Sequence, residues 1–308
     1  MDTDRLENNV RTSHPSQSAA RLAMLAAAVL WSTSGLFAKA PLFAEWPADA
    51  RGGLLAFWRS TFAALVLLPL IRRPRWRRGL VPLGVAFAGM NITYLTAMSL
   101  STAANAIWLQ STAPGWVFLI GVFLLREPVV GRDLVPLIFA MAGVGTILGF
   151  ELQDKIHLDV LFGAASGICY ATVVVSMRSL RGEDSAWVVA LGHVATVVVL
   201  LPWVVGQGVW PSPEQLLVLA GFGIFQMAIP YVLLLRALRT IHSQEAAVIG
   251  LVEPVLMPLW VFLVWREIPA WWTAAGAAMI LAGLLLRYVV LERWYNPVMA
   301  KGKIHADP

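Results

Sequence analysis

The sequence predicts an all-α polytopic membrane protein in which ten transmembrane helices form two inverted five-helix repeats around a central cavity, with both termini cytoplasmic. Composition is the first of three observations behind this prediction: 58% of the 308 residues are hydrophobic, 13% are charged and the mean hydropathy is +0.71. The second is an internal repeat, and the third is the placement of Lys and Arg. Apolar runs of about 20 residues, long enough to cross hydrocarbon as a helix, recur almost throughout. Because these runs are continuous rather than alternating, they indicate helices and not a β-barrel.

The breaks between apolar runs place the ten helices. They lie near residues 20–40, 53–71, 80–99, 103–125, 133–150, 158–177, 186–206, 214–236, 245–265 and 271–290. The weakest break is the third, where LSTAANA (100–106) offers only small polar residues as a turn. We expect residues 1–18 to be a disordered cytoplasmic segment, 19–151 the first repeat, 152–291 the second, and 292–308 a cytoplasmic tail. No cleavable signal peptide is evident, so the first run is expected to be a retained span.

An offset of 140 residues superposes the two halves. It aligns Pro114 with Pro254, Leu119 with Leu259, Arg126-Glu127 with Arg266-Glu267, and Ala142-Gly143 with Ala282-Gly283. Repeated membrane segments are typical of transporters, because two like halves around one site provide two ways of opening it. Five spans is an odd number, so the second half enters the membrane from the opposite side and the repeat is inverted.

Lys and Arg set the orientation, since cytoplasmic loops carry the excess of these residues. With the amino terminus inside, the inner segments hold eighteen of the 23: Arg5, Arg11, Arg21, Arg72, Arg73, Arg75, Arg77, Arg78, Arg126, Arg132, Arg178, Arg181, Arg236, Arg239, Arg287, Arg293, Lys301 and Lys303. The outer side keeps five, namely Lys39, Arg51, Arg59, Lys155 and Arg266. We interpret the basic loop 72–79 as a topology anchor at anionic headgroups rather than a nucleic-acid patch.

Several stretches resemble the EamA-type transporters of the drug/metabolite transporter superfamily. They are AAAVLWSTSGLFAK (26–39), FWRSTFAALVLL (57–68), APGWVFLIGVFLLREP (113–128) and EPVLMPLWVFLVWREIP (253–269). The likeness covers roughly residues 20–290 and implies this fold and a transport function without specifying the substrate. Arg126 and Arg266 depart from it, because they stand where the family commonly has Gly before the Glu. The many Trp residues and the helix cores are similar to bacterial inner-membrane exporters of amino acids, including aromatic ones.

Polar side chains near mid-span are the candidates for a substrate site, because burial in hydrocarbon is costly unless they face a cavity or a neighbouring helix. We predict substrate-binding roles for Trp31, Ser34, Asn91, Tyr94, Trp108, Gln110, Tyr170, His193, Gln226, Tyr231 and Glu253. Trp31 corresponds to Tyr170 at an offset of 139, and Asn91 to Tyr231 at 140. Aromatic walls and amides at one depth suit a flat, amphiphilic solute. Hydrogen bonding between helices is the alternative reading of each residue.

Three ionisable residues carry opposed interpretations. Glu253 precedes Pro254, which removes a helical hydrogen bond, so its carboxylate could bind an ammonium or carry a proton, or bond a neighbouring helix while protonated. His193 could titrate near neutral pH, but a hydrogen bond to neighbouring backbone is favoured. Arg59 could hold a substrate carboxylate, but its stem is long enough to snorkel outward, and we favour snorkelling.

Pro114 and Pro254 are matched prolines within spans, and we predict that they are gating bends for alternating access. The glycines at 143, 145, 149, 276 and 283 are expected to permit tight helix packing rather than to mark a site.

The sequence favours a secondary, non-ATP transporter over other classes. An enzyme is disfavoured because no span holds paired acids and no HExxH or CxxC occurs; an ATP-driven pump is disfavoured because no GxxxxGK[ST] loop occurs. We predict export of small metabolites, most of all amino acids including aromatic ones, from a bacterial inner membrane. A permease for other metabolites or cationic drugs is the alternative. The expected partners are the small-molecule substrate and the bilayer, with no nucleic acid, cofactor, metal or disulfide (Cys169 is the single cysteine), and a monomer is allowed.

Overall fold

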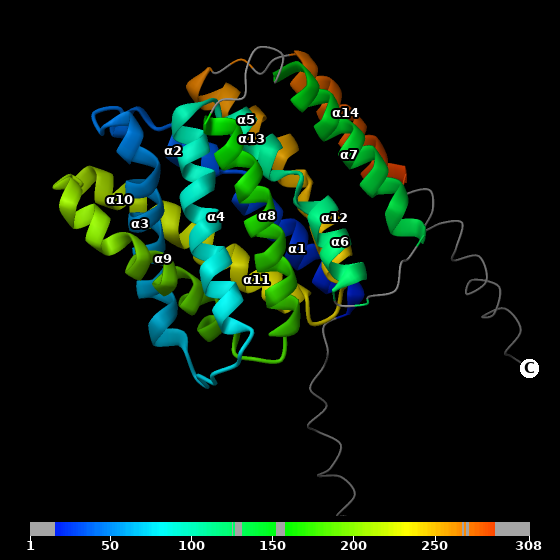
Figure 1. Ribbon diagram of the computed structural model, residues 1–308, viewed down its shortest axis with the longest axis horizontal. Helices are drawn as coiled ribbons and strands as arrows, with labels where there is room; N and C mark the ends of the chain where they lie inside the picture. The colour runs from blue at the N-terminus through cyan, green and yellow to red at the C-terminus, as the bar shows by residue number, and fades with distance from the viewer. Residues whose placement is uncertain are drawn as a thin grey trace, which may run out of the picture.

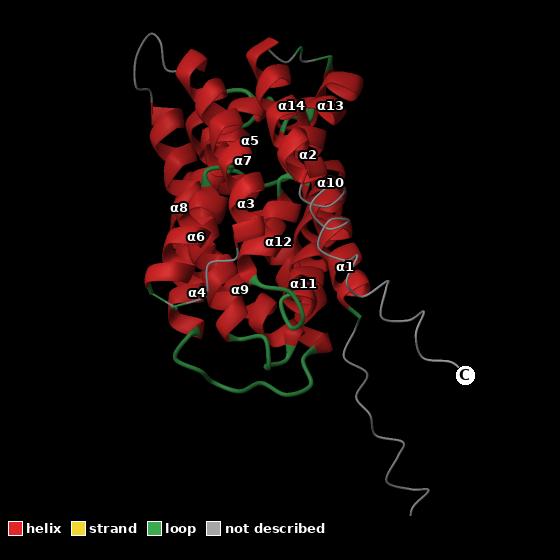
Figure 2. Ribbon diagram, turned by 90° about the vertical axis from the view of Figure 1, so that its right-hand side faces the viewer, coloured by secondary structure: helices red, strands yellow, loops and turns green. Residues whose placement is uncertain are grey.

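The computed structural model describes residues 16–124, 126, 131–151, 158–266, 268 and 271–286. This part of the chain is all-helical (Figures 1 and 2). Eight of its helical stretches are long and apolar enough to cross a membrane, and Leu137–Phe150 and Ala274–Gly283 are two shorter apolar stretches. The predicted helical membrane fold is therefore confirmed.

Each half supplies five spans. The first comprises α1 (Gln17–Trp31) with α2 (Ser34–Ala38), α3 (Ala48–Leu67) extended by a 3-10 turn (Leu68–Leu70), α4 (Leu80–Leu100), α5 (Ala103–Gln110) with α6 (Ala113–Phe123), and α7 (Gly131–Glu151). The second comprises α8 (Leu158–Ser179), α9 (Ser185–Gln207), α10 (Pro213–Gly223) joined by a π-helical turn (Ile224–Ala228) to α11 (Ile229–Ala237), α12 (Ser243–Gly250) with α13 (Val252–Trp265), and α14 (Trp271–Leu285). The uncertain break after Leu100 is real, because the Thr102 hydroxyl caps α5 at the backbone N–H of Asn105.

The packing of the helices repeats with the sequence. The second span packs on the seventh (α3 on α9) and the fifth on the tenth (α7 on α14), so each of these pairs maps onto itself when the halves are exchanged. The third span packs on the sixth (α4 on α8), and its equivalent is the contact of the eighth with the first (α11 on α1). Figure 1 shows α7 and α14 side by side at the edge of the bundle. This pattern is what a pseudo-two-fold relation between five-helix halves produces.

Breaks near mid-span occur at equivalent places in the fourth and ninth spans. α5 gives way to α6 at Ser111 and Thr112, and α12 gives way to α13 at Leu251, 140 positions later. The hydroxyls at the first break are satisfied locally, because that of Ser111 donates to the carbonyl of Ile107 (2.6 Å) and that of Thr112 to the carbonyl of Leu109 (2.9 Å). Pro114 and Pro254 lie in the first turns of α6 and α13, where a missing N–H costs least.

The fold also accounts for two departures from expectation. Arg126 and Arg266 have left-handed backbones (φ 53° and 59°), which explains why Gly is favoured at both places. Gly145 and Gly149 have nothing within 4 Å of an added Cβ, so the tight packing predicted for them is wrong. Close packing instead occurs at Gly223, where a Cβ would strike the backbone carbonyl of Arg59, so α10 approaches α3 at the depth of that arginine.

Candidate functional site

A small cavity lies between the two halves at the level of the helix breaks. Its volume of about 20 Å³ suffices for one water molecule and is too small for an amino acid. Its lining comes from both repeats and consists of Trp31, Arg59, Met90, Tyr94, Gln110, Tyr170, Gln226, Met227, Tyr231 and Glu253. The helices are therefore contracted around this site, and a solute enters only when they move apart.

Arg59 is the buried cation of the cavity, with 1% of its surface exposed. Its Nη2 donates to Oδ1 of Asn91 (2.6 Å) and its Nη1 to Oε1 of Gln226 (3.2 Å). The guanidinium also lies over the ring of Phe222, 4.9 Å from its centre. The expected outward snorkelling of Arg59 is wrong, because two amides and an aromatic face from neighbouring helices solvate the charge inside the bundle.

Further hydrogen bonds orient the two amides that hold this arginine. The amide nitrogen of Asn91 donates to the carbonyl of Phe87 (2.9 Å), which leaves Oδ1 for the guanidinium. The amide nitrogen of Gln226 donates to the carbonyl of Trp31 (3.5 Å), where α1 ends. Gln226 lies in the π-helical turn because Pro230, four residues later, supplies no N–H for its carbonyl. The breaks in the helices thus position the groups around Arg59.

Glu253 is the acidic residue that lines the cavity, and it is 7% exposed in the first turn of α13. Within the described residues, its carboxylate accepts no hydrogen bond and forms no salt bridge, including with Arg59. A basic and an acidic side chain therefore line one buried site without contacting each other. Buried ionisable groups without a direct partner are expensive in a protein interior, so they mark this cavity as a candidate functional site.

Aromatic rings close the remaining side of the cavity. The Trp31 ring lies edge-on to Tyr231 (4.9 Å between centres) and Tyr170 (6.0 Å). The Tyr231 hydroxyl donates to the sulfur of Met90 at 3.2 Å. Two buried donors here, the Trp31 indole N–H and the Arg59 Nε–H, have no hydrogen-bond partner among the described residues. The site therefore offers apolar faces beside unused donors.

Both halves of the chain match one family: residues 18–149 and residues 157–289 each match the EamA-like transporter family. This chain belongs to the EamA-like transporter family. It is a membrane transporter and not an enzyme.

Relatives of this EamA-like transporter span archaea, bacteria and humans. An uncharacterised transporter of Archaeoglobus fulgidus is 27% identical over 86% of this chain and 95% of its own length. Human solute carrier family 35 member G1 is 24% identical over 85% of this chain and 77% of its own length. An S-adenosylmethionine uptake transporter of Rickettsia bellii is 22% identical over 75% of this chain and 81% of its own length. A solved crystal structure with 21% identity superposes with a TM-score of 0.71, covering 90% of this chain and all of that one, and supports the fold.

The structure brings seven of the predicted site residues of this EamA-like transporter to the cavity: Trp31, Tyr94, Gln110, Tyr170, Gln226, Tyr231 and Glu253. Two other predicted residues do not line the cavity but form hydrogen bonds with residues that do. Asn91 holds Arg59, and the Ser34 hydroxyl bonds the Tyr94 hydroxyl at 3.0 Å.

Two predicted residues lie away from the cavity. Trp108 is fully buried in the packing core, with its indole N–H unbonded within the described residues. His193 packs against Phe87 (4.8 Å between ring centres), and neither ring nitrogen has a partner in the part of the chain described. The hydrogen bond to backbone that the sequence favoured for His193 is therefore not observed.

Sequence reasoning did not predict three lining residues as site residues: Arg59, Met90 and Met227. The methionines carry no signal, since Met is ordinary in an apolar span. Arg59 did carry one, because an arginine two turns inside an apolar helix indicates a functional site by default.

Proposed function

We propose that this EamA-like transporter exports zwitterionic amino acids, including aromatic ones, across a bacterial inner membrane by alternating access at the central cavity. The observation that carries the proposal is the pair Arg59 and Glu253, which line one small cavity without contacting each other. The guanidinium would bind the substrate carboxylate, and the Glu253 carboxylate would bind the ammonium.

The rest of the site suits the remainder of such a solute. Trp31, Tyr170 and Tyr231 provide ring faces and edges for an apolar or aromatic side chain. The free Nε–H of Arg59 and the indole N–H of Trp31 supply donors for a carboxylate. Amides at Gln110 and Gln226 replace water at the polar end. Aromatic rings and charged or polar groups thus line the same small cavity, and this combination favours amino acids over purely apolar drugs.

Alternating access would use the breaks. The half-helices that meet at Ser111 and at Leu251 start again with a proline in the first turn, so α6 and α13 are able to swing against α5 and α12. One break belongs to each repeat, and each would open one side of the membrane.

S-adenosylmethionine is the second candidate substrate, because relatives bear the name of its uptake transporters. It carries the same ammonium and carboxylate, with a flat adenine for the aromatic wall and an added sulfonium charge. The same Arg59 and Glu253 contacts would hold it.

Competition against labelled tryptophan tests the proposal at the level of single groups. Tryptamine lacks the carboxylate and indole-3-propionate lacks the ammonium. In the wild type both should compete far more weakly than tryptophan. Arg59→Gln should bring tryptophan down to the level of tryptamine, and Glu253→Gln should bring it down to that of indole-3-propionate. Glu214→Gln, which removes an exposed acid outside the site, is the matched control. Equal competition by all three compounds would contradict the proposal.

A further inference from the structure

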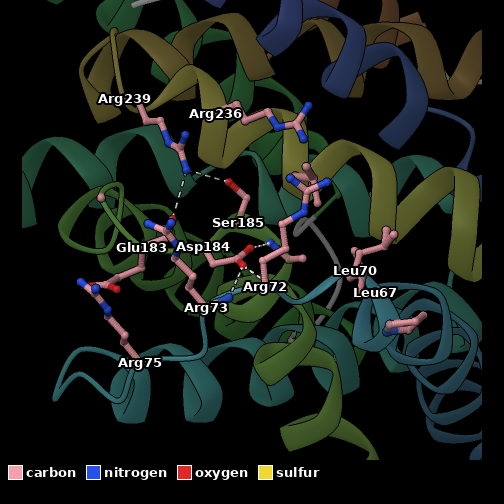
Figure 3. Close-up of a pocket in the computed structure, with 14 residues that line it drawn as sticks. Leu67, Leu70, Arg72, Arg73, Arg75, Glu183, Asp184, Ser185, Arg236 and Arg239 are labelled. Carbon is pink, nitrogen blue, oxygen red and sulfur yellow. Dashed lines mark hydrogen bonds between the residues drawn. The ribbon is translucent and has the colours of Figure 1, made fainter. Parts of the chain in front are cut away.

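A second, larger hollow lies at one end of the bundle, away from the central cavity. Its volume is about 760 Å³, and it is formed where three spans end or begin: the end of α3, the start of α9 and the end of α11. Figure 3 shows the side chains that line it. We call it the basic cleft, because five arginines surround it: Arg72, Arg73 and Arg75 from the first half, and Arg236 and Arg239 from the second.

Most of these guanidinium groups have no acidic partner. Among the described residues, the side chains of Arg72, Arg73, Arg75 and Arg236 form no hydrogen bond or ion pair. Only Arg239 is bonded, to the backbone carbonyls of Arg181 and Glu183 and to the Ser185 hydroxyl. Four free guanidinium groups therefore remain around one hollow, where they repel one another in the absence of an anion.

The two acids of the cleft are already engaged elsewhere. Asp184 accepts hydrogen bonds from the backbone N–H groups of Arg72 (2.8 Å) and Arg73 (3.0 Å) and caps α9 through Ala186 (2.9 Å). Partial burial alone would raise the pKa of Asp184, but these N–H donors lower that pKa below its ordinary value. Glu183 pairs at 2.6 Å with Arg77, which lies outside the cleft. Neither acid therefore forms a salt bridge with the four free arginines in the part of the chain that the structure describes.

The position of the cleft is that of lipid headgroups. The membrane-spanning stretches Ala48–Leu70, Ser185–Gln207 and Pro213–Ala237 all have an end at it, so it lies at the boundary between hydrocarbon and water. Its wall is apolar on the membrane side, where Leu67, Leu70 and Val232 line it. Leu70 is 58% exposed, as a side chain that contacts acyl chains would be.

We propose that the basic cleft binds the headgroup of an anionic phospholipid from the adjacent leaflet, which the charge distribution predicts to be the cytoplasmic one. The phosphate would accept hydrogen bonds from Arg72 and Arg236, and the acyl chains would leave along Leu70. Because these arginines come from opposite repeats, the bound lipid bridges the two halves at this end of the transporter. Phosphate and arginine suit each other through bidentate hydrogen bonds.

Native mass spectrometry of the full chain in neutral detergent tests the proposal. Phosphatidylglycerol and phosphatidylcholine with the same acyl chains are titrated separately. The wild type should retain phosphatidylglycerol preferentially. An arginine that contacts the anionic headgroup contributes about fivefold in affinity, so Arg72→Gln/Arg236→Gln should weaken phosphatidylglycerol binding about 25-fold. The phosphatidylcholine affinity should stay unchanged.

The matched control is Arg78→Gln/Arg181→Gln, which removes the same charge from exposed residues of the neighbouring loops that do not line the cleft. This control pair should keep the preference for phosphatidylglycerol over phosphatidylcholine. Arg72→Lys/Arg236→Lys, which retains both positive charges, should keep most of that preference. If the glutamine pair does not fold, Arg236→Gln alone should still lose about fivefold. Equal losses in the control pair, or no preference in the wild type, would overturn the proposal. Displacement of phosphatidylglycerol by millimolar inorganic phosphate would assign the cleft to a soluble anion instead and would likewise overturn it.

Discussion

Replacing Asn91 with Asp separates the two roles of Arg59, holding the fold together and binding substrate. The side chains have the same shape, and Oδ1 of Asn91 already lies 2.6 Å from Nη2 of Arg59. A carboxylate there makes the hydrogen bond to Arg59 charge-assisted at both ends, which offsets the loss of the amide hydrogen bond to the Phe87 carbonyl, so the fold should be kept. The guanidinium would then be neutralised before any substrate arrives.

The magnitude follows from Coulomb's law. A substrate carboxylate bound to the other side of the same guanidinium would lie about 5 Å from the carboxylate introduced by Asn91→Asp, and at an effective dielectric constant of about 20 the repulsion is about 3 kcal/mol. That corresponds to a loss of about a hundredfold in affinity for tryptophan. Asn91→Ala should behave differently: it leaves the buried charge short of an acceptor and destabilises the protein by about 1.5–3 kcal/mol.

The assay is tryptophan binding by purified protein, alongside the free energy of unfolding in a detergent titration. Thr196→Val is the mild control, since its hydroxyl contacts the Asn91 amide nitrogen only at 3.5 Å. The expected result for Asn91→Asp is unchanged stability with binding reduced about a hundredfold. Wild-type tryptophan affinity in a stably folded Asn91→Asp protein would refute the placement of the substrate carboxylate on Arg59.

Three further predictions rest on other parts of the structure. If Glu253 relays protons, Glu253→Gln should abolish the response of tryptophan flux to an imposed pH gradient; a response as large as that of the wild type would exclude the relay. Pro114→Ala restores an N–H in the first turn of α6 and should slow transport while leaving expression intact, so unchanged transport kinetics would count against gating there. Because the folded pKa of Asp184 is depressed, its contribution to stability is present above its unfolded pKa and is lost as the pH falls; acid titration of unfolding should therefore show a smaller loss for Asp184→Asn than for the wild type, and parallel curves would show that these N–H bonds are not stabilising.

The spans were predictable because they depend on local properties of the chain. Apolar length alone places most helices within a few residues, and the repeat resolves the turn at Ser101 and Thr102 by analogy with the loop after Thr240. The second span shows the limit. Its helix α3 begins at Ala48, five residues before the apolar run suggests, because its first turn contains the polar residues Asp49 and Arg51, which an apolar pattern does not count as part of a span.

Residues of the site were predictable only where their depth within a membrane span is enough to indicate that they face the interior of the bundle. Polar residues at mid-span face the interior, which is why Trp31, Gln110 and Glu253 reach the cavity. The depth of Arg59 marked it as a functional candidate, but the direction of its side chain could not be predicted, because that direction depends on Asn91 and Gln226 from distant spans. His193 fails for the same reason, since it packs on the ring of Phe87 instead of lining the cavity, and no sequence spacing reveals that contact.

Flux through the purified protein tests the central proposal most directly. Proteoliposomes would be offered tryptophan, phenylalanine and threonine, with a small metabolite that is not an amino acid as the control. Each would be measured for the wild type, for Arg59→Gln and Glu253→Gln, and for the matched Glu214→Gln. The account predicts saturable amino-acid flux that both site variants lose and the control variant keeps, with no flux of the control solute. Flux of the control solute alone would contradict the amino-acid assignment while leaving a transporter of another substrate.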